Sequence, residues 1–352
     1  MKEKFMTNRT YSLDVIRAFA ILFVVANHAI ELIFPFGAIQ YQSMSFAYQI
    51  FQFIVFTTGR LGVPLFLMLT GYLLVPRDYS TKEKILNFYK RNFIGLILVW
   101  YIWIILYNLF FLFFEHKQFV LSDVISEFLF VHNVPLMHTW YMKEIIIIYS
   151  ILPVLSIVIK RLKSIPIVIV IILVIAIINN LFGGIRYLRF LSNQLMYIAY
   201  VCTGYYFAVS KSYLNRFWNL SIFIFGFCSI VTWQIYTYHG PNPTTVWYTN
   251  VLLYLTSLPL FSLLLVNRWR KGQLAQYVIF LSIISFGIYL LHVPVMKIIL
   301  SVFPSINNIG AINVFLLFVL SITASAVIIY PITKIPLAAR ILFYIKGMDK
   351  SK

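Results

Sequence analysis

The chain has 352 residues, of which 61% are hydrophobic, 18% aromatic and 11% charged, and its formal net charge is +18. A soluble domain is usually about half apolar and a quarter charged. The composition and the recurring long apolar runs therefore exclude a soluble two-domain enzyme, a disordered chain and a disulfide-stapled secreted module. The basic residues lie in clusters between the apolar runs instead of forming one patch. This argues against a nucleic-acid partner and is typical of a polytopic membrane protein.

The apolar runs predict an all-α membrane protein with about ten transmembrane helices. We expect these helices over residues 11–34, 46–75, 92–114, 138–159, 165–182, 192–210, 217–237, 247–267, 276–302 and 311–333. This divides the chain into a short N-terminal segment 1–10, a transmembrane domain 11–333 and a basic tail 334–352. We expect no cleavable signal peptide, because the first apolar run lacks a small-residue cleavage site.

The basic residues also predict an orientation. One side of the predicted membrane receives the N-terminal segment, the tail and every second loop between helices, beginning with the loop after the second helix. These parts hold 21 of the 28 Lys and Arg residues, whereas the loops on the opposite side hold only Lys117, Arg186 and Arg189. The second connection carries five of the 21, namely Arg77, Lys82, Lys84, Lys90 and Arg91. Cytoplasmic loops of membrane proteins are enriched in Lys and Arg. We therefore expect both termini in the cytoplasm and a multi-pass protein of the inner (cytoplasmic) membrane.

The first predicted helix carries four ionisable residues, Asp14, Arg17, His28 and Glu31. At about 100° per residue they fall within an arc of about 100°, which is not a lipid-facing design. Arg17 and His28 are separated by about 16 Å along the axis. A cation near the cytoplasmic end and an imidazole deeper in the membrane suit a phosphate-bearing donor that enters from the cytoplasm. The alternatives are that Asp14 and Arg17 only stabilise the helix end, and that His28 only makes an interhelical hydrogen bond.

Other predicted spans also contain ionisable residues, which are costly at membrane depth and often mark a site. They are Arg60, Lys143, Glu144, His292 and Lys297. His292 lies about 24 Å into its helix, close to the expected depth of His28, so the two histidines are candidates for one site. Gly59, Gly62 and Pro64 permit a break in the second span.

Four segments in this order resemble the membrane-bound acyltransferase 3 family. The first is Arg17, ten residues, then His28, preceded by Leu13-Asp14. The second is Gly62-Val-Pro-Leu-Phe-Leu-Met-Leu-Thr70-Gly71-Tyr72. The third is His138-Thr-Trp140-Tyr141 with the later Tyr149 and Pro153, and the fourth is Ile288-Tyr289-Leu290-Leu-His292. The resemblance runs from about Tyr11 to Tyr330.

The resemblance implies transfer of an acyl group, commonly acetyl from acetyl-CoA as co-substrate, to a hydroxyl of a cell-envelope glycan or lipid-linked glycan. Relatives often have Arg-x-x-Arg before the third helix, whereas this chain has Arg91 and then Ile94, with Lys90 as a possible substitute. Many relatives also carry a hydrolase-like domain that completes transfer outside the cell. We expect a stand-alone form here, with a separate extracytoplasmic acyltransferase as a possible partner.

The resemblance and the residue types together suggest roles. We expect Arg17, Asp14, Arg60, Lys90 and Arg91 to bind the donor, and a lipid bilayer and the glycan to be the remaining partners. His28 is expected to act as general base and Glu31 to orient it, with His292 and Tyr289 as further catalytic candidates. Substrate-binding candidates are His138, Trp140, Lys143 and Glu144. We expect no metal ion.

The main alternative is a transporter or flippase of a glycan or acylated lipid, in which the intramembrane charges form a translocation path. The absence of an internal repeat with broken helices argues mildly against it. A sensor or scaffold without turnover is the third alternative, and the number of intramembrane ionisable residues argues against that one.

Overall fold

The computed structural model describes residues 11–162, 164–181, 186–210, 215–267, 269 and 272–345, with no side-chain description for 180–190. Within these residues the protein is all-helical. The predicted segment 1–10, the end of the tail and the basic residues Lys163, Lys211, Arg268, Arg270 and Lys271 lie outside the described residues.

All ten predicted ranges contain a helix. Among the described residues, seven helices are long and apolar enough to cross a membrane: Tyr11–Ile33, Phe46–Leu74, Lys82–Phe113, Trp140–Arg161, Arg216–Tyr238, Ala275–Val302 and Ala311–Ile332. α9 (Ile165–Leu181) and α12 (Val251–Val266) have 17 and 16 residues, fewer than the ~20 that a straight span needs. α10 (Arg186–Ser210) is not among the seven. A ten-span topology with cytoplasmic termini therefore stays a prediction.

The chain divides into two compact units. Unit 1 comprises Met1–Pro76 and Leu162–Ser285, and unit 2 comprises Arg77–Arg161 and Phe286–Lys352. Unit 1 holds α1 (Tyr11–Ile33), α2 (Ala38–Ser43), α3 (Phe46–Arg60), α4 (Gly62–Leu74), α9, α10, α11 (Arg216–Tyr238), α12 and the first part of α13 (Ala275–Val302). Unit 2 holds α5 (Lys82–Phe88), the π-helical segment η1 (Tyr89–Phe93), α6 (Ile94–Phe113), α7 (Leu121–Phe128), α8 (Trp140–Arg161), the rest of α13, the 3₁₀ segment η2 (Pro304–Asn307), α14 (Ala311–Ile332) and α15 (Pro336–Phe343).

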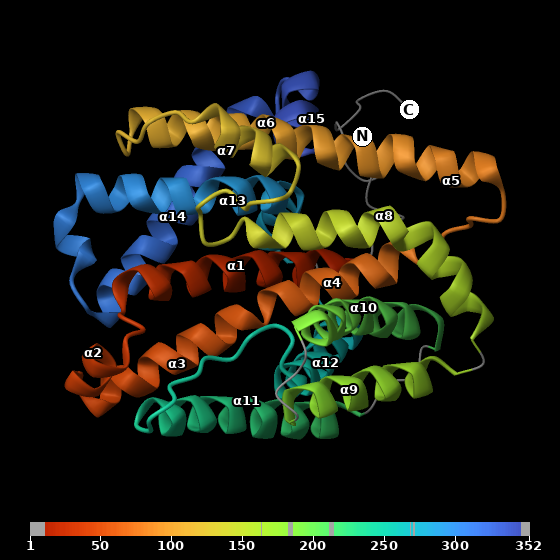
Figure 1. Cartoon of the computed structure of the whole chain (residues 1–352), viewed down its shortest axis with the longest axis horizontal. Coiled ribbons are helices and arrows are strands. Elements are labelled where there is room, and N and C mark those ends of the chain that lie inside the picture. Colours follow the sequence, from red (N-terminus) through yellow and green to blue (C-terminus); the bar gives the residue numbers. More distant parts are fainter. Residues whose placement is uncertain are drawn as a thin grey trace. The chain divides into compact units, whose positions relative to one another are not determined.

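Glycines bring the helices of unit 1 together. α1 packs against both α3 and α4 (Figure 1). A Cβ added to Gly59 would lie 2.4 Å from the Asn27 Cβ, and one added to Gly62 would lie 2.6 Å from the Ala20 carbonyl oxygen. Gly71 of α4 approaches α10 even more closely, because its added Cβ would lie 1.9 Å from the Val201 carbonyl oxygen. These positions admit only glycine without a shift of backbone.

The second span is interrupted at Leu61, next to the glycines and proline that permit a break there. α3 ends at Arg60 and α4 begins at Gly62. Pro64 has no N–H to donate to the Arg60 carbonyl, so the regular helical ladder is interrupted there. The path of the chain nevertheless continues, because Leu61 keeps helical backbone angles. The interruption places Arg60 at the end of one helix, beside α1.

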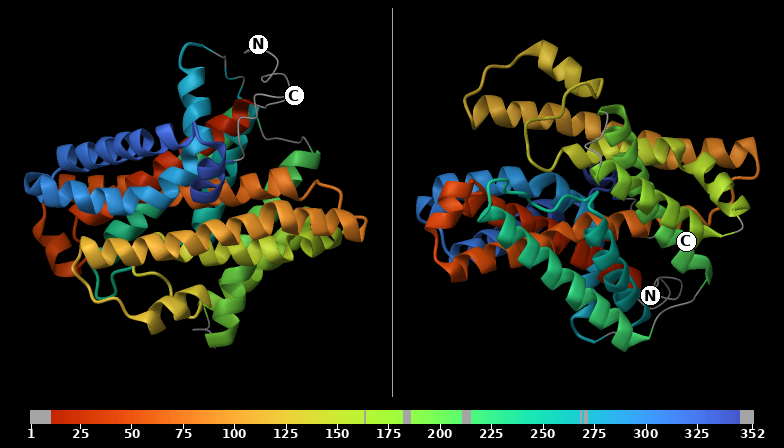
Figure 2. Two further views of the ribbon diagram at one scale, coloured as in Figure 1. Left: turned by 90° about the horizontal axis from the view of Figure 1, so that it is seen from above. Right: turned by 60° about the horizontal axis from the view of Figure 1, so that its bottom comes forward.

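The prediction that residues 76–91 form a loop between the second and third spans is wrong for most of that range. Residues 82–93 are helical and continue into α6, so that Lys82–Phe113 forms one long rod, clearly visible in Figure 2. Thr81 caps this rod by accepting a hydrogen bond from the Lys84 N–H, and Glu83 lies in its first turn. The tail contains α15, which the sequence did not predict.

Candidate functional site

In unit 1, His28 belongs to a buried polar cluster, which we call the α1 cluster: His28, Glu31, Arg60 and Tyr248. The His28 Nδ1 lies 2.7 Å from the Glu31 Oε2, one turn further along α1. The Arg60 Nη2 donates to the Glu31 Oε1 at 3.0 Å, and its Nη1 donates to the Tyr248 hydroxyl at 3.0 Å. His28 is 4% exposed and Arg60 5% exposed, so the charges are shielded from solvent.

The hydrogen bond to Glu31 determines the tautomer of the neutral His28 ring. An ionised carboxylate only accepts hydrogen bonds, so the neutral His28 ring carries its proton on Nδ1, toward Glu31. The lone pair of the neutral ring is then on Nε2. Glu31 therefore occupies the orienting position that the sequence predicted for it, and Arg60 holds Glu31 from the other side.

Arg60 is held by more than its ion pair. Its guanidinium carbon lies 4.3 Å from the Phe56 ring centroid and 4.8 and 4.9 Å from those of Trp247 and Tyr248. Aromatic faces stabilise a desolvated guanidinium by roughly 1–2 kcal/mol each. Since both terminal nitrogens of Arg60 already have partners, its predicted role in donor binding stays a prediction, whereas its contact with Glu31 is a property of the fold.

Tyr248 was not identified from the sequence. It lies in the segment before α12, where Asn250 caps the helix by accepting from the Leu252 N–H at 2.8 Å. Gln234 of α11 ties this segment to α3, because its Oε1 accepts from the Val246 N–H at 2.9 Å and its amide donates to the Thr57 hydroxyl at 2.9 Å. The asparagine cap was the only sequence signal for this arrangement.

The other two predicted residues of α1 lie near its N-terminal end. The Asp14 Oδ1 accepts from the Ser282 hydroxyl at 2.7 Å, and the Arg17 Nη1 donates to the same hydroxyl at 3.1 Å. Arg17 and Asp14 are also 3.8 Å apart as an i, i+3 pair. Asp14 is buried, whereas the Arg17 side chain retains 29% exposure. Ser282 thus holds both residues, a contact that no motif in the sequence predicts.

In unit 2, a second buried cluster contains Tyr107, His138, Tyr289 and His292, and we call it the α13 cluster. The rings of His138 and His292 are 4.9 Å apart between centroids. The Tyr289 hydroxyl donates to the His138 carbonyl at 2.7 Å. The structure therefore brings together three residues that the sequence predicted in different roles. Tyr107 is the member that the sequence missed.

Proline explains why Tyr107 is there. Pro294 has no N–H, so the Leu290 carbonyl, four residues earlier, loses its helical hydrogen bond. The Tyr107 hydroxyl donates to this carbonyl at 2.7 Å. With its only proton used, this hydroxyl accepts from the His138 Nε2 at 3.1 Å, which places the neutral ring's lone pair on Nδ1.

The remaining predicted residues lie outside the two clusters. Trp140 opens α8; Lys143 donates to the Phe130 carbonyl at 3.0 Å; Glu144 is half-buried beside it. Lys90 and Arg91 are exposed in η1. His28 and Arg17 belong to unit 1, whereas His292, Lys90 and Arg91 belong to unit 2, so a shared histidine site and a shared donor site stay predictions.

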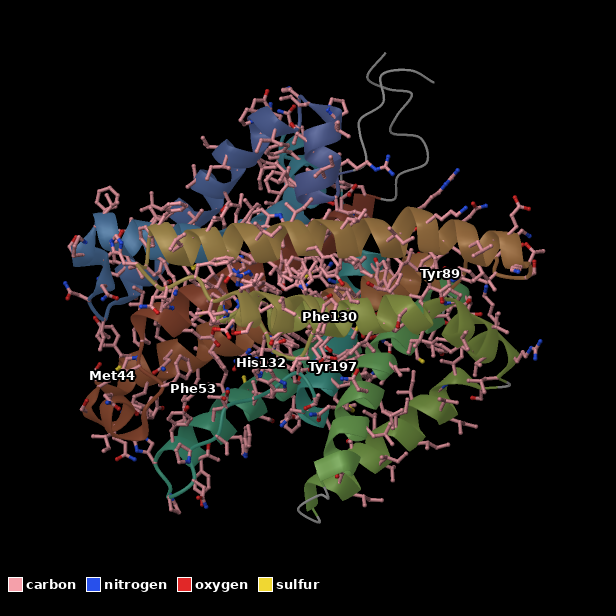
Figure 3. The ribbon with its side chains drawn as sticks, turned by 45° about the horizontal axis from the view of Figure 1, so that its top comes forward. Met44, Phe53, Tyr89, Phe130, His132 and Tyr197 are labelled. Atoms are coloured by element: carbon pink, nitrogen blue, oxygen red, sulfur yellow. The ribbon has the colours of Figure 1, made fainter. Side chains whose placement is uncertain are left out.

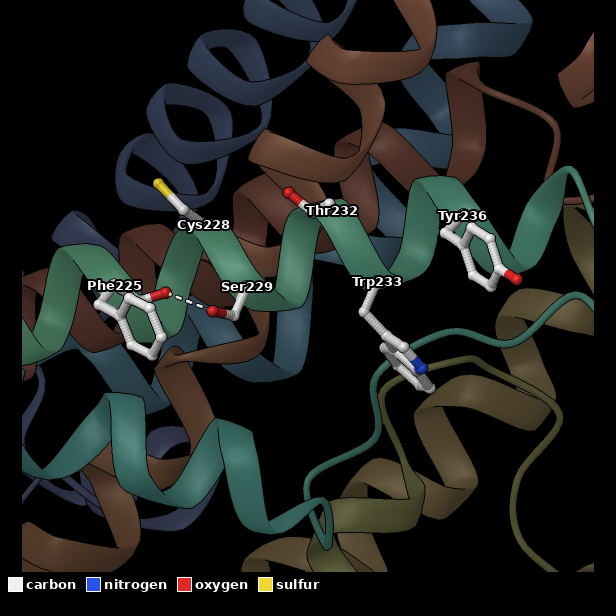
Figure 4. Close-up of a pocket in the computed structure, with 6 residues that line it drawn as sticks. All are labelled: Phe225, Cys228, Ser229, Thr232, Trp233 and Tyr236. Atoms are coloured by element: carbon white, nitrogen blue, oxygen red, sulfur yellow. Dashed lines mark hydrogen bonds between the residues drawn. The ribbon is translucent and has the colours of Figure 1, made fainter.

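A surface hollow on α11 differs from the two buried clusters. It has a volume of about 490 Å³ and its lining residues all come from α11, as Figure 4 shows for Phe225, Cys228, Ser229, Thr232, Trp233 and Tyr236. The Ser229 hydroxyl bonds to the Phe225 carbonyl of its own helix at 2.8 Å. A depression on one apolar helix offers no convergent polar groups for catalysis.

The comparison with protein families is decisive for identity. The model of a family described as an acyltransferase domain matches residues 10–331, nearly the whole chain. The chain belongs to the acyltransferase 3 family. The four segments that carried the resemblance all lie within the matched residues, so that interpretation is confirmed. Acyltransferase 3 membership and the seven apolar helices identify a multi-pass membrane acyltransferase. Neither the curated proteins nor the solved structures contain a match to this chain.

Proposed function

We propose that this acyltransferase moves an acetyl group from cytoplasmic acetyl-CoA to a hydroxyl of a cell-surface polysaccharide or lipid-linked glycan. The observation that carries the proposal is the α1 cluster: a histidine of a family motif, 2.7 Å from a carboxylate that a buried arginine holds in place. A base oriented by a second group is the arrangement that activates a hydroxyl nucleophile.

The reaction follows from the protonation of this histidine. The His28 Nε2 accepts the proton of the acceptor hydroxyl while that oxygen attacks the thioester carbonyl carbon. Glu31 stabilises the imidazolium that forms. The C–S bond then breaks, and the coenzyme A thiolate takes the proton from the Nε2. The products are an acetyl ester and coenzyme A, and the base is restored.

The donor is placed by charge. Arg17 lies eleven residues before His28, about 16 Å along α1, and its partly exposed guanidinium is held by Ser282 and Asp14. We propose that Arg17 binds a phosphate of acetyl-CoA and that the flexible pantetheine arm extends along α1 toward His28. Lys90 and Arg91 are the donor-binding candidates of unit 2. The Tyr289 and His292 side chains are second candidates for contact with the reacting groups.

The direction of transfer depends on topology. We propose ten spans, both termini in the cytoplasm and location in the inner membrane, because 21 of the 28 basic residues fall on one predicted side. Cysteine accessibility at residues 77 and 305, on opposite predicted sides, tests this arrangement in intact cells.

The central test is a comparison of His28→Ala with His239→Ala, an exposed histidine of the same unit. We expect radiolabelled acetyl transfer in membrane vesicles to be lost in His28→Ala and kept in His239→Ala. Mass spectrometry of the envelope glycans then identifies the acceptor by the loss of one acetyl unit. Unchanged transfer in His28→Ala would contradict the mechanism, and continued glycan export without acetylation would argue against the flippase alternative.

A further inference from the structure

A second pocket lies in unit 2, at the C-terminal end of α6. It has a volume of about 290 Å³, at the lower end of the range for small-molecule sites. Its walls come from the last turns of α6, from the connection between α6 and α7, from α7 and from the segment that leads to α8. The residues used below are Asn108, Phe111, Lys117, Asp123, Glu127, His132 and Asn133. Figure 3 labels His132, in the segment after α7.

The pocket lies about one membrane thickness from the basic residues of η1, measured along the helical rod. Lys90 and Phe111 are 21 residues apart on one continuous helical rod, which corresponds to about 31 Å. The hydrocarbon core of a bilayer is about 30 Å thick. In the proposed topology, with this rod crossing the bilayer, the pocket at Phe111 lies on the side of the membrane opposite Lys90.

The chemistry of the walls is that of a site for hydroxyl groups. Asp123 and Glu127 only accept hydrogen bonds, whereas Asn133 both donates and accepts, and His132 does so when neutral. A sugar hydroxyl also does both, so such a wall can satisfy several hydroxyls of one ring. Phe111, which is 5% exposed and lies under the Lys117 ammonium, contributes only a small apolar part of the lining.

The charges disfavour an anion. Lys117 is the basic member of the wall, and its ammonium is already 2.5 Å from the Glu115 carboxylate and 4.8 Å from the Phe111 ring centroid. The lining holds two carboxyl groups, Asp123 and Glu127, against this one ammonium, so its net charge is −1 when both are ionised; burial raises the pKa of Glu127. Within the described part of the chain no group of three or more His, Cys, Asp or Glu residues is placed to hold a metal ion, and this pocket forms part of that chain.

Hydrogen bonds to α6 and to α8 hold the walls of the pocket in position. The Asn108 amide donates to the Glu127 carboxylate at 2.7 Å and so joins α6 to α7. Lys143 of α8 fixes the Phe130 carbonyl at 3.0 Å. His116 and Phe130, which follow α6 and α7, have positive φ angles of 52° and 57°, although glycine is the usual residue for that conformation. Non-glycine residues kept in this conformation are often found at binding sites.

We propose that this pocket binds one neutral sugar ring and holds the acceptor glycan on the outer side of the membrane. Identifying the sugar as the acceptor depends on the proposed function, whereas binding of the sugar does not. Asp123 and Asn133 hydrogen-bond the ring hydroxyls, Glu127 braces the wall through Asn108, and the glycan continues out of the pocket.

The test uses the full chain in lipid nanodiscs, free of sugar-based detergent. Saturation-transfer NMR with methyl β-D-glucopyranoside is expected to show saturable binding. Asp123→Ala and Asn133→Ala, both at exposed positions, are expected to weaken that binding about fivefold each, as for the loss of one hydrogen bond. Asp78→Ala, an exposed aspartate near the start of α5 in the same unit, is the matched control and leaves binding unchanged.

Charge gives a second, independent readout. Glucuronic acid, which carries a carboxylate on the same ring, is expected to bind more weakly than the methyl glucoside, and Asp123→Asn is expected to narrow that difference. No saturable binding, or equal binding by the pocket variants and Asp78→Ala, would overturn the proposal. His28→Ala distinguishes the sugar pocket from the proposed mechanism. If the pocket binds sugar, this variant still binds the methyl glucoside. If the variant still transfers acetyl groups, the proposed mechanism is wrong and the pocket is unaffected.

Discussion

The contact between Gly59 and α1 offers a direct test of how the fold positions His28. An alanine Cβ at residue 59 would lie 2.4 Å from the Asn27 Cβ and 2.6 Å from the Asn27 Cα, where ordinary contact begins at 3.4 Å. The obstructing atoms belong to the backbone and its first carbon, so no rotamer change relieves the clash. Gly59→Ala therefore forces α3 and α1 apart by about 1 Å.

This displacement acts on both ends of the α1 cluster. Gly59 precedes Arg60 and Asn27 precedes His28, so a 3.0 Å bond between Arg60 and Glu31 lengthens to a distance at which it is no longer a hydrogen bond. A misplacement of 1 Å costs on the order of 10²-fold in rate. Crowding of a packed contact also costs about 1–3 kcal/mol of stability.

The measurement compares kcat for acetyl transfer and the thermal midpoint of Gly59→Ala with those of the wild type. Gly272→Ala is the matched control, because nothing lies within 4 Å of its added Cβ. We expect kcat to fall about 10²-fold in Gly59→Ala and to stay unchanged in Gly272→Ala. A lower midpoint with wild-type kcat would refute the link between this contact and the site.

Three further changes test other parts of the structure. Glu31→Gln removes the carboxylate that orients the histidine, and we expect kcat to fall about 10²-fold with the KM for acetyl-CoA unchanged; a rise in KM alone would contradict this role. Gly71→Ala places a Cβ 1.9 Å from the Val201 carbonyl oxygen, so we expect little folded protein by size-exclusion chromatography, and a normal yield would contradict the close packing. Burial favours a higher pKa for Glu115, but its ion pairs with Lys117 and Lys297 outweigh burial and hold the pKa below 4.5. Glu115→Gln should therefore cost up to about 1 kcal/mol at neutral pH. The difference should begin to shrink as the pH falls below about 4.5 and should be lost once the pH has passed the lowered pKa of Glu115; a pH-independent cost in urea unfolding would contradict the ion pairs.

The sequence predicts the positions of the helices well, because a bilayer demands long apolar runs. It failed where charge was taken as a sign of a loop. Lys82, Lys84, Lys90 and Arg91 were assigned to a connection, yet they lie on the helical rod that continues into α6. Thr81 and Glu83, a cap and a first-turn acid, were the signals that a helix begins there.

In the candidate site, contacts within one helix could be predicted from the sequence, whereas contacts between helices could not. The pairing of His28 with Glu31 follows from the helical repeat, so it could be predicted from one helix alone. The contacts of Glu31 with Arg60 and of Arg17 with Ser282 join different helices, and no single helix pattern contains that information. Tyr107 could have been sought from Pro294, because a proline within a helix leaves a carbonyl in need of a donor.

The ion pair between Glu31 and Arg60 also bears on how the chain is made. Glu31 enters the membrane on α1 before its partner exists, since Arg60 lies 29 residues later. At a synthesis rate of about 5–20 residues per second, the wait lasts only a few seconds. Glu31 lies two residues from the end of α1, so its carboxylate can stay in the interfacial water until α3 arrives. The position of Glu31 near the end of α1 thus lets a charge that is later paired enter first without lying alone in lipid.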